Sequence, residues 1–384
     1  MRIAILSHHT CPLVAMGRAR VGGMNAYLRG MCSALARWGM EVNLFTCAHD
    51  APHEAVGLSP GVRVEHIPLG YPPTDAQGLL ASINAFWQGV LRSASGRFRV
   101  VHAHYWTSGL AGLRLAEAWG VPLVVTFHTT ALAKRLFLDS HTEPASRLRA
   151  ERLLAQRAQG ITASSTHEVA LLTQGYGADP HRILLAPPGV DLEHFRPGDR
   201  EGGRRLFRLP DVPLVLAVGR PDPIKRFPLL IDALAHMEEG HLAIAGEHDG
   251  VLRGLAQRLG VEHRLHLLGP VPVHVMPHLY SAADLVVVPS TYESFGMVAL
   301  EGMACGRPVV ASRVGGLAGL VAHGQTGYLV ERACPRAYAF RMETLLGSPT
   351  LRQAMGERAL QRARLFSWDA WAVRVVSWYQ GLAG

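Results

Sequence analysis

Lysine is rare in this chain, and one of its two lysines lies in a turn where an isolated cation could bind phosphate. The stretch AVGRPDPIKRF at 217–227 holds Lys225 together with Arg220, between an apolar strand and an apolar helix. Both cations are therefore expected at the carboxyl edge of a parallel sheet, where such folds bind ligands. A compact ammonium can reach one phosphate oxygen that a planar guanidinium approaches too broadly. The simpler alternative is a solvated charge pair ahead of a helix.

Two glutamates flank the predicted start of another helix in YESFGMVALEGMACGRPVV, residues 292–310. Glu293 precedes this helix, whose first amides, near 295–297, have no partner within the helix. Glu301 falls one to two turns inside it, among apolar and small residues, where an ionised carboxylate needs hydroxyl or amide donors. Sugar or ribose hydroxyls would meet that need, and a helix cap and a surface charge are the alternatives.

A glycine pair, Gly22 and Gly23, separates the first predicted strand at 2–7 from the helix that follows. Backbone amides and the helix dipole at such a junction can receive a phosphate, and a tight turn would use the same residues. The fuller dinucleotide fingerprint G-x-G-x-x-G is absent, which disfavours a dinucleotide-binding oxidoreductase. The helix is expected to end at Gly39 and to share one apolar face among Met24, Tyr27, Leu28, Met31, Leu35 and Trp38.

Histidines follow two neighbouring predicted strands of the first half. The stretches HAHYW at 102–106 and TFHTT at 126–130 place polar side chains at the carboxyl ends of those strands: His102, His104, Tyr105, His128 and Thr129. With 20 histidines in the chain, a single histidine is ordinary. The position at a strand end, facing the expected ligand edge, is what singles out His128.

Short β-branched runs alternate with longer amphipathic segments, a pattern typical of parallel α/β sheets. The first series of runs lies at 2–7, 41–46, 62–67, 99–104, 122–127 and 182–187. After a stretch rich in proline and glycine at 187–198, a second series lies at 213–219, 241–245, 264–268, 284–289 and 307–311. We expect two doubly wound α/β domains, 1–190 and 191–366, with ligands between them and the Trp-rich helix of 367–384 packed back on the first.

Charge favours an anionic partner. The net charge of +8 suits nucleotides or phosphorylated metabolites, and no nucleic-acid-binding motif is present, so no nucleic acid partner is expected. No run approaches the roughly 18 apolar residues of a membrane span, and the first strand is too short for a signal-peptide core. A cytoplasmic location is expected.

Metal and disulfide motifs are missing from the sequence. The five cysteines are scattered and form no C-x-x-C pair, which argues against a disulfide framework and a zinc knuckle. Walker A, H-E-x-x-H and D-x-D motifs are absent as well. The sequence therefore predicts a metal-free phosphate site that requires no cofactor, and Mg²⁺ is not predicted.

These motifs together resemble the retaining glycosyltransferases of family 4, glycosyl transferases group 1. The resemblance covers essentially the whole chain and rests on the glycine pair, on Arg220 with Lys225, and on Glu293 and Glu301, which match the E-x7-E signature. The stretches HTCPL, GGMNAYLRG, HAHYWTSGLAG and TFHTTALAK are similar to the subgroup of inositol-phosphate N-acetylglucosaminyltransferases of the mycothiol pathway and sucrose-phosphate synthases. This resemblance implies the GT-B fold, in which two Rossmann-like domains face a cleft.

The resemblance also implies a role for individual residues. The second domain would hold a nucleotide-diphosphate sugar, and the donor-binding residues implied are Gly22, Gly23, Arg220, Lys225, Glu293, Phe295, Gly296, Met297 and Glu301. The catalytic residues implied are His128, beside the transferred sugar, Arg220, Lys225 and Glu293. The acceptor residues implied are Asn25, Tyr105, Thr129 and Arg147. The subgroup also uses a lysine in the region 70–80 and an acidic residue at position 20, and this chain has no lysine there and Arg20, which leaves room for a different small acceptor.

The implied reaction moves a hexose or N-acetylhexosamine, most readily from UDP, to a hydroxyl of a small acceptor, either phosphorylated or not, with retention of configuration. Negative charge grows on the departing diphosphate, so two cations and helix-terminal amides would stabilise it without a metal.

Three other interpretations stay open. The chain could bind a nucleotide sugar without catalysis, or it could be an NAD-dependent oxidoreductase. The Arg-rich segment 146–157 is compatible with contact to an anionic membrane and hence a lipid acceptor. The sequence does not decide whether the protein forms oligomers.

Overall fold

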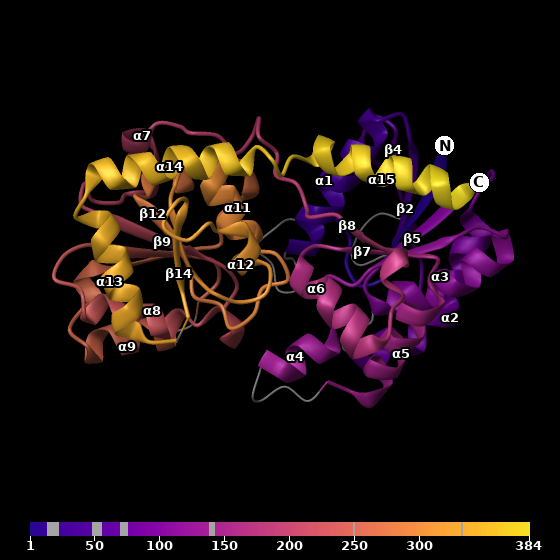
Figure 1. Cartoon of the computed structure of the whole chain (residues 1–384), viewed down its shortest axis with the longest axis horizontal. Coiled ribbons are helices and arrows are strands. Elements are labelled where there is room, and N and C mark those ends of the chain that lie inside the picture. Colours follow the sequence, from indigo (N-terminus) through magenta and orange to yellow (C-terminus); the bar gives the residue numbers. More distant parts are fainter. Residues whose placement is uncertain (14–22, 48–55, 70–75, 138–142, 249, 332) are drawn as a thin grey trace. The chain divides into compact units, whose positions relative to one another are not determined.

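The computed structural model describes all of residues 1–384 except 14–22, 48–55, 70–75, 138–142, 249 and 332. Within the described part, the chain forms two compact α/β units. The first contains the N-terminal strand, Gly23–Gly189 and the C-terminal segment Trp368–Gly384, and the second is Val190–Ser367. The chain thus enters the second unit within the proline- and glycine-rich stretch and returns to the first just before the C-terminal helix (Figure 1).

The described residues of the first unit build an eight-stranded sheet in the order β3-β4-β2-β1-β5-β6-β7-β8. Its strands are β1 (Arg2–Ser7), β2 (Glu41–Cys47), β3 (Val56–Ser59), β4 (Val62–Ile67), β5 (Val100–His104), β6 (Leu123–Thr126), β7 (Gly160–Ala163) and β8 (Ile183–Leu185). All neighbours pair in parallel except β3, which pairs antiparallel with β4. The prediction of a parallel sheet is confirmed, and β3 and β7 are additions to the predicted strands.

Helices cover both faces of this sheet. Successive side chains of β1 therefore alternate between two hydrophobic cores. Ile3 and Ile5 join the side chains of α1 and α15, whereas Ala4 and Leu6 join those of α2, α3 and α5. The helices of the unit are α1 (Gly23–Arg37), α2 (Ala76–Ser93), α3 (Trp106–Trp119), α4 (Ala131–Phe137), α5 (Ala145–Arg157), α6 (Thr166–Ala170) and α15 (Trp368–Ala383).

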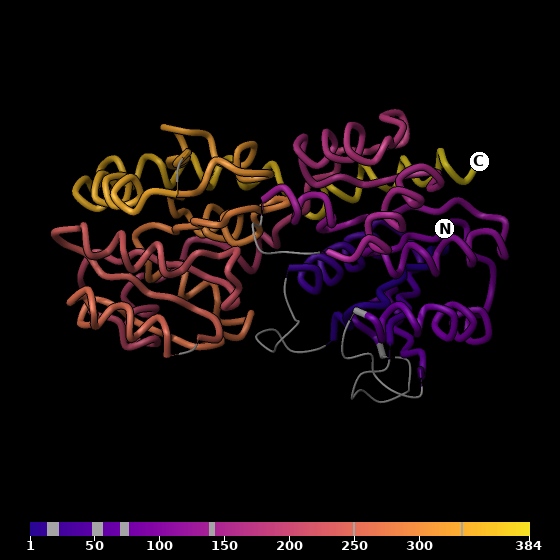
Figure 2. Tube along the Cα trace, turned by 90° about the horizontal axis from the view of Figure 1, so that it is seen from below, coloured from indigo at the N-terminus to yellow at the C-terminus, as the bar shows by residue number. Residues whose placement is uncertain are grey.

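The C-terminal helix α15 packs against α1 at a glycine. A Cβ added to Gly30 would meet the Trp368 indole at 2.1 Å, so the indole occupies the space that any larger side chain would need. Figures 1 and 2 show this helix in yellow among the elements of the first unit. The predicted apolar face of α1 is wrong at Trp38, which lies beyond the helix end, is 44% exposed and donates a hydrogen bond to Asp369.

The described residues of the second unit build a six-stranded parallel sheet in the order β11-β10-β9-β12-β13-β14. Its strands are β9 (Leu214–Val218), β10 (His241–Ala245), β11 (Leu265–Gly269), β12 (Leu285–Val288), β13 (Val309–Ser312) and β14 (Gly327–Val330). Five of them match predicted runs to within a few residues, and β14 is an addition.

Helices cover this second sheet on both faces as well. Leu214 and Leu216 pack with α10, α11 and α14, and Val215 and Ala217 pack with α8, α9 and α13. The helices of the unit are α7 (Arg200–Phe207), α8 (Phe227–Ala235), α9 (Gly250–Arg258), α10 (Met276–Ala282), α11 (Met297–Ala304), α12 (Leu317–Leu320), α13 (Pro335–Leu346) and α14 (Pro349–Ala363). Among the helices that the structure describes, none is both long enough and apolar enough to cross a bilayer.

Candidate active site

Each sheet has one pair of neighbouring strands from which the connections to the next strands run in opposite directions across the sheet. In the first sheet this switch point lies between β1 and β5, and in the second between β9 and β12. Ligands of open α/β sheets bind outside the carboxyl ends of the strands at such a switch point. The predicted residues Lys225 and Glu293 follow β9 and β12, and Tyr105 follows β5, so they fall at these two points.

Lys225 and Glu293 form an ion pair at the switch point of the second sheet. The Lys225 Nζ atom lies 2.5 Å from Glu293 Oε1, and both side chains keep about a fifth of their surface exposed, at 22% and 17%. Ser290 donates its hydroxyl to the same carboxylate oxygen at 2.8 Å. The Thr291 amide donates to the Ile224 carbonyl at 2.8 Å, which ties the two loops together. The structure therefore brings together two residues that lie 68 positions apart in the sequence.

A second glycine pair holds the Glu293 loop in place. The Gly316 amide donates to the Glu293 carbonyl at 2.9 Å, and Gly315 has a positive φ of 46°. A Cβ on Gly315 would lie 2.1 Å from that carbonyl oxygen, and a Cβ on Gly316 would lie 2.4 Å from the Phe295 Cα. Only glycine allows the two backbones to approach this closely. Sequence reasoning missed these glycines, although VGG at 314–316 repeats the VGG at 21–23.

The helix after Glu293 begins at Met297, one residue after Gly296, whose φ of 111° only glycine adopts readily. Within the described residues no side chain caps this helix. Its first amides are therefore available to an anion or to a hydroxyl oxygen, as the sequence predicted for Phe295, Gly296 and Met297.

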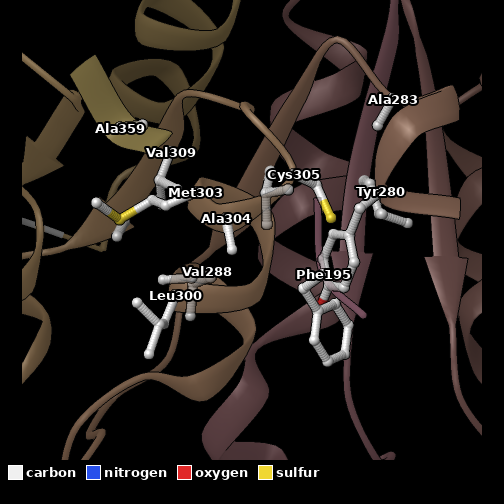
Figure 3. Close-up of a cluster of buried hydrophobic side chains, with 14 of the residues drawn as sticks. Phe195, Tyr280, Ala283, Val288, Leu300, Met303, Ala304, Cys305, Val309 and Ala359 are labelled. Atoms are coloured by element: carbon white, nitrogen blue, oxygen red, sulfur yellow. The ribbon is translucent and has the colours of Figure 1, made fainter. Parts of the chain in front are cut away.

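Glu301 has the donor that its apolar surroundings require. The Tyr280 hydroxyl donates to Glu301 Oε2 at 2.7 Å. Figure 3 shows the Tyr280 ring beside Phe195 and Cys305 in the core of the unit. Burial raises the pKa of Glu301 to about 7, and the hydrogen bond from Tyr280 only partly offsets this rise. Glu301 therefore changes its charge near neutral pH.

Arg220 follows β9 and is exposed. Its side chain makes no hydrogen bond or ion pair with the residues that the structure describes, which leaves all five N–H donors open to a ligand. The structure thus places Arg220 and Lys225 on one loop and does not pair Arg220 with either glutamate.

In the first unit, the ring of Tyr105 contacts two polar groups. His9 stacks on it with centroids 4.8 Å apart, and the guanidinium of Arg147 lies 4.9 Å from its centroid. Arg147 also donates to the Thr129 carbonyl at 2.8 Å. Three of the four predicted acceptor residues, Tyr105, Thr129 and Arg147, are therefore neighbours. His9 is an addition to the site, and its place directly after the first strand was the signal for it.

Arg147 is buried and held by two carboxylates. Its guanidinium nitrogens lie 2.9 Å from a carboxylate oxygen of Glu143 and 2.7 Å from one of Glu151. Glu143 also forms an ion pair with Lys134, whose Nζ lies at 2.7 Å. Burial alone would lower the pKa of Arg147, but Tyr105, Glu151 and Glu143 together raise it. An anionic acceptor would have to share Arg147 with Glu143.

The predicted fourth acceptor residue, Asn25, is buried in α1. It accepts a hydrogen bond from the Thr10 hydroxyl at 2.9 Å and donates to the Cys11 carbonyl at 2.7 Å. It therefore fixes the loop after β1, next to His9. Gly23 is exposed at the start of α1, and Gly22 lies outside the described residues.

His128 sits in a strained turn at the end of β6. Its φ is 61°, and the Thr129 amide donates to the Phe127 carbonyl at 2.7 Å, which closes a three-residue turn around it. Such γ-turns are rare, and a strained non-glycine residue is a feature of functional sites. Tyr105, at the end of the neighbouring strand, also has a positive φ, of 76°. Burial lowers the pKa of His128 to about 3, so its imidazole is neutral at physiological pH.

The two units match two family models. The model described as "Glycosyl transferase 4-like domain" matches residues 22–189, and the model described as "Glycosyl transferases group 1" matches residues 204–362. The chain belongs to the glycosyl transferases group 1 family. The first match contains every predicted acceptor residue, and the second contains Arg220, Lys225 and both glutamates.

Two relatives match the sequence of this glycosyltransferase over almost its whole length. The D-inositol 3-phosphate glycosyltransferase 2 of Catenulispora acidiphila is 39% identical over 402 residues, which cover 98% of this chain and 94% of that protein. The D-inositol 3-phosphate glycosyltransferase of Actinosynnema mirum is 41% identical over 392 residues, covering 96% and 94%.

Solved structures confirm the predicted GT-B fold. The sucrose-phosphate synthase of Thermosynechococcus elongatus is 30% identical, with a TM-score of 0.92 over 99% of this chain and 98% of that one. HepE of Anabaena, solved with UDP and glucose, is 22% identical, with a TM-score of 0.81 over the full length of both chains. At that identity the likeness shows the fold alone. The protein is an enzyme, a glycosyltransferase of the GT-B class.

Proposed function

We propose that this glycosyltransferase moves a hexose or N-acetylhexosamine from a UDP-sugar to a small phosphorylated polyol, with retention of configuration and without a metal ion. The acceptor class is supported by the relatives named D-inositol 3-phosphate glycosyltransferases, which match along almost the whole chain. The choice of UDP follows the resemblance to that subgroup.

The observation that carries this proposal is the contact between Lys225 and Glu293 at the switch point of the second sheet. A cation suited to a phosphate oxygen lies beside a carboxylate suited to sugar hydroxyls, which is what a nucleotide-diphosphate sugar presents at the bond that breaks. The open amides at the start of α11 add further donors. Glu301, partly buried and hydrogen-bonded to Tyr280, would accept from the ribose hydroxyls.

These residues stabilise the charges that separate as the donor is cleaved. As the bond between the sugar and the phosphate breaks, positive charge grows at the anomeric carbon and negative charge grows on the diphosphate. Lys225 moves from Glu293 to the diphosphate and stabilises it together with Arg220. The acceptor hydroxyl then attacks from the face that the diphosphate leaves, and its proton passes to the departing phosphate.

The acceptor binds on the first unit. Tyr105, Thr129 and Arg147 form one contact group, and Arg147 supplies the cation for an acceptor phosphate in exchange for Glu143. His128, held in its strained turn, contacts the transferred sugar.

A donor screen followed by an acceptor screen tests this function. The protein is incubated with UDP-, GDP- and ADP-sugars, and release of nucleoside diphosphate is measured alone and with inositol phosphate, unphosphorylated inositol or fructose 6-phosphate. We expect release from UDP-sugars that a phosphorylated polyol accelerates. Equal rates with inositol and inositol phosphate would contradict the phosphorylated acceptor, and release only from GDP- or ADP-sugars would contradict the donor.

A further inference from the structure

Three histidines contact one another at the turn of His128, and two of them, His102 and His104, are fully buried. His102 and His104 come from β5, and their ring centroids lie 4.3 Å apart. The two nitrogens of His102 face hydroxyls, of Tyr379 in α15 and of Thr126, the latter at 2.7 Å. His104 Nδ1 lies 3.0 Å from His128 Nε2. A nitrogen of the catalytic His128 is thus occupied by protein rather than by substrate.

The contact between His104 and His128 fixes a proton. Two imidazole nitrogens at hydrogen-bond distance need one proton between them, because two N–H groups would repel and two lone pairs would not bond. Both rings are neutral near pH 7, since burial lowers the pKa of each. Each neutral ring carries a single N–H, so the ring that donates across this contact decides which nitrogen of the other is protonated.

The surroundings of His104 decide between the two arrangements. His104 is fully buried, and its Nε2 has no hydrogen-bond partner among the described residues. If His128 donated, His104 would carry its proton on Nε2, as a buried N–H without an acceptor. If His104 donates, that nitrogen is a lone pair instead. Buried donors without partners are rarer in native proteins than under-satisfied acceptors.

We infer that His104 is a positioning residue that donates from Nδ1 to His128 Nε2 and so holds His128 in the tautomer protonated at Nδ1. His128 then carries its single N–H at Nδ1, which makes this nitrogen a donor and not an acceptor. The strained turn fixes the backbone of His128, and His104 fixes its proton. The consequence for catalysis rests on the proposed function, but the tautomer itself does not.

The tautomer can be measured without turnover. Long-range ¹H–¹⁵N correlation spectra of the full chain, labelled with ¹⁵N at histidine, distinguish protonation at Nδ1 from protonation at Nε2, and the signals lost in His128→Gln identify His128. Between pH 6.5 and 8 we expect His128 in the Nδ1–H form. In His104→Leu, the Nδ1–H form should no longer dominate. An Nε2–H form in the wild type, or an Nδ1–H form that persists in His104→Leu, would overturn the inference.

Kinetics separate this role from simple packing. His104→Leu should lower kcat by roughly 10-fold or more, less than the 10²- to 10⁴-fold that a general acid or base itself contributes, and leave the donor KM within about twofold. His104→Asn keeps an N–H donor near the place of Nδ1 and should restore both the tautomer and most of kcat. Tyr379→Phe disturbs the same three histidines through His102 and should leave the His128 tautomer unchanged. Equal losses of kcat in the Leu and Asn variants would overturn the positioning role.

Discussion

At the scale of single residues, the rarity of lysine is the most telling feature of the chain. Lys225 and Lys134, its two lysines, both pair with a glutamate beside a predicted ligand site. In each place the ammonium shares its carboxylate with another group, Ser290 in one case and Arg147 in the other. These are ion pairs that a phosphate can enter by exchange, because the cation stays while its anionic partner changes.

Replacing Lys225 by alanine should remove the charge that stabilises the departing diphosphate. We expect kcat to fall by about 10²- to 10³-fold, the range for loss of one preorganised donor in the transition state. Lys225→Arg should restore little of this, because a guanidinium lacks the compact shape of an ammonium. Steady-state kinetics with the donor identified by the screen measure both effects.

Arg253→Ala is the matched control for this variant. Arg253 is an exposed cation of the same unit and pairs with Glu262 at 4.0 Å, far enough for a weak surface interaction. It should leave kcat unchanged, and circular dichroism should show all three variants folded. Wild-type turnover in Lys225→Ala would remove this residue from the mechanism.

Glu301 should make stability depend on pH. Its pKa in the folded chain is about 7, above the ordinary value of 4.5, so the folded state holds a proton that the unfolded chain releases. This contribution is fully present below pH 4.5 and is lost as pH rises to 7. Relative to Glu301→Gln, the wild type should lose up to about 3 kcal/mol across this window.

Urea unfolding of both proteins at pH 4.5, 5.5, 6.5 and 7.5 measures this difference. The Gln variant keeps the shape and an oxygen for Tyr280, so only the titration is removed. A stability difference that stays constant over the four pH values would show that folding does not raise the pKa of Glu301.

At the scale of helices and strands, the sequence predicts what apolar runs can specify. Runs such as RIAILS and PLVLAVG match β1 and β9 closely, because strands buried on both faces need continuous apolar residues. The strands β3, β7 and β14 contain VGLS, GITA and GYLV, only four residues each and each with a glycine. Their pairing comes from neighbouring strands rather than from their own propensity.

The site was predictable where it depends on strand ends and less so where it depends on side-chain partners. Lys225, Glu293 and His128 follow strands, so their placement followed from the α/β alternation. The ion pairs of Arg147 depend on Glu143 and Glu151, whose spacing of four residues on either side was a readable signal. Ser290 and the His104 contact could not be predicted, since they depend on loop geometry and on the register of two strands.

The packing of α1 against α15 can be tested at Gly30. Alanine normally favours a helix over glycine, but here its Cβ would overlap the Trp368 indole. We expect Gly30→Ala to destabilise the protein by about 1–3 kcal/mol, the cost of overpacking a core. Thermal and urea unfolding give this value.

Gly381→Ala provides the comparison, since Gly381 lies in α15 itself and a Cβ there would meet nothing within 4 Å. This substitution should be neutral or stabilise by up to about 1 kcal/mol. If Gly30→Ala were equally neutral, the described contact between α1 and α15 would not hold in solution.

At the scale of the whole molecule, the chain is two α/β units, each with predicted ligand-binding residues at its own switch point. The second unit presents cations, open helix amides and a partly buried carboxylate, which suit a nucleotide-diphosphate sugar. The first presents an aromatic ring in contact with His9 and Arg147, which suits a polyol phosphate. The net charge of +8 suits the two anionic substrates that we propose.

Metal independence is a proposal about the complete enzyme. Because Lys225, Arg220 and helix amides are proposed to neutralise the diphosphate, activity should be unchanged after dialysis against EDTA and should not rise on addition of Mg²⁺. Assays of nucleotide release with and without the chelator measure this. Activity that disappears in EDTA and returns with Mg²⁺ would assign the diphosphate to a metal ion instead.

The stereochemistry of the product tests the central claim most directly. A ¹H NMR time course follows the wild-type enzyme with an α-linked UDP-sugar and inositol phosphate, and the anomeric coupling constant identifies the first glycoside formed. The account predicts an α-glycoside, formed together with UDP in equal amounts. A β-glycoside as the first product, or UDP release without any glycoside, would contradict it.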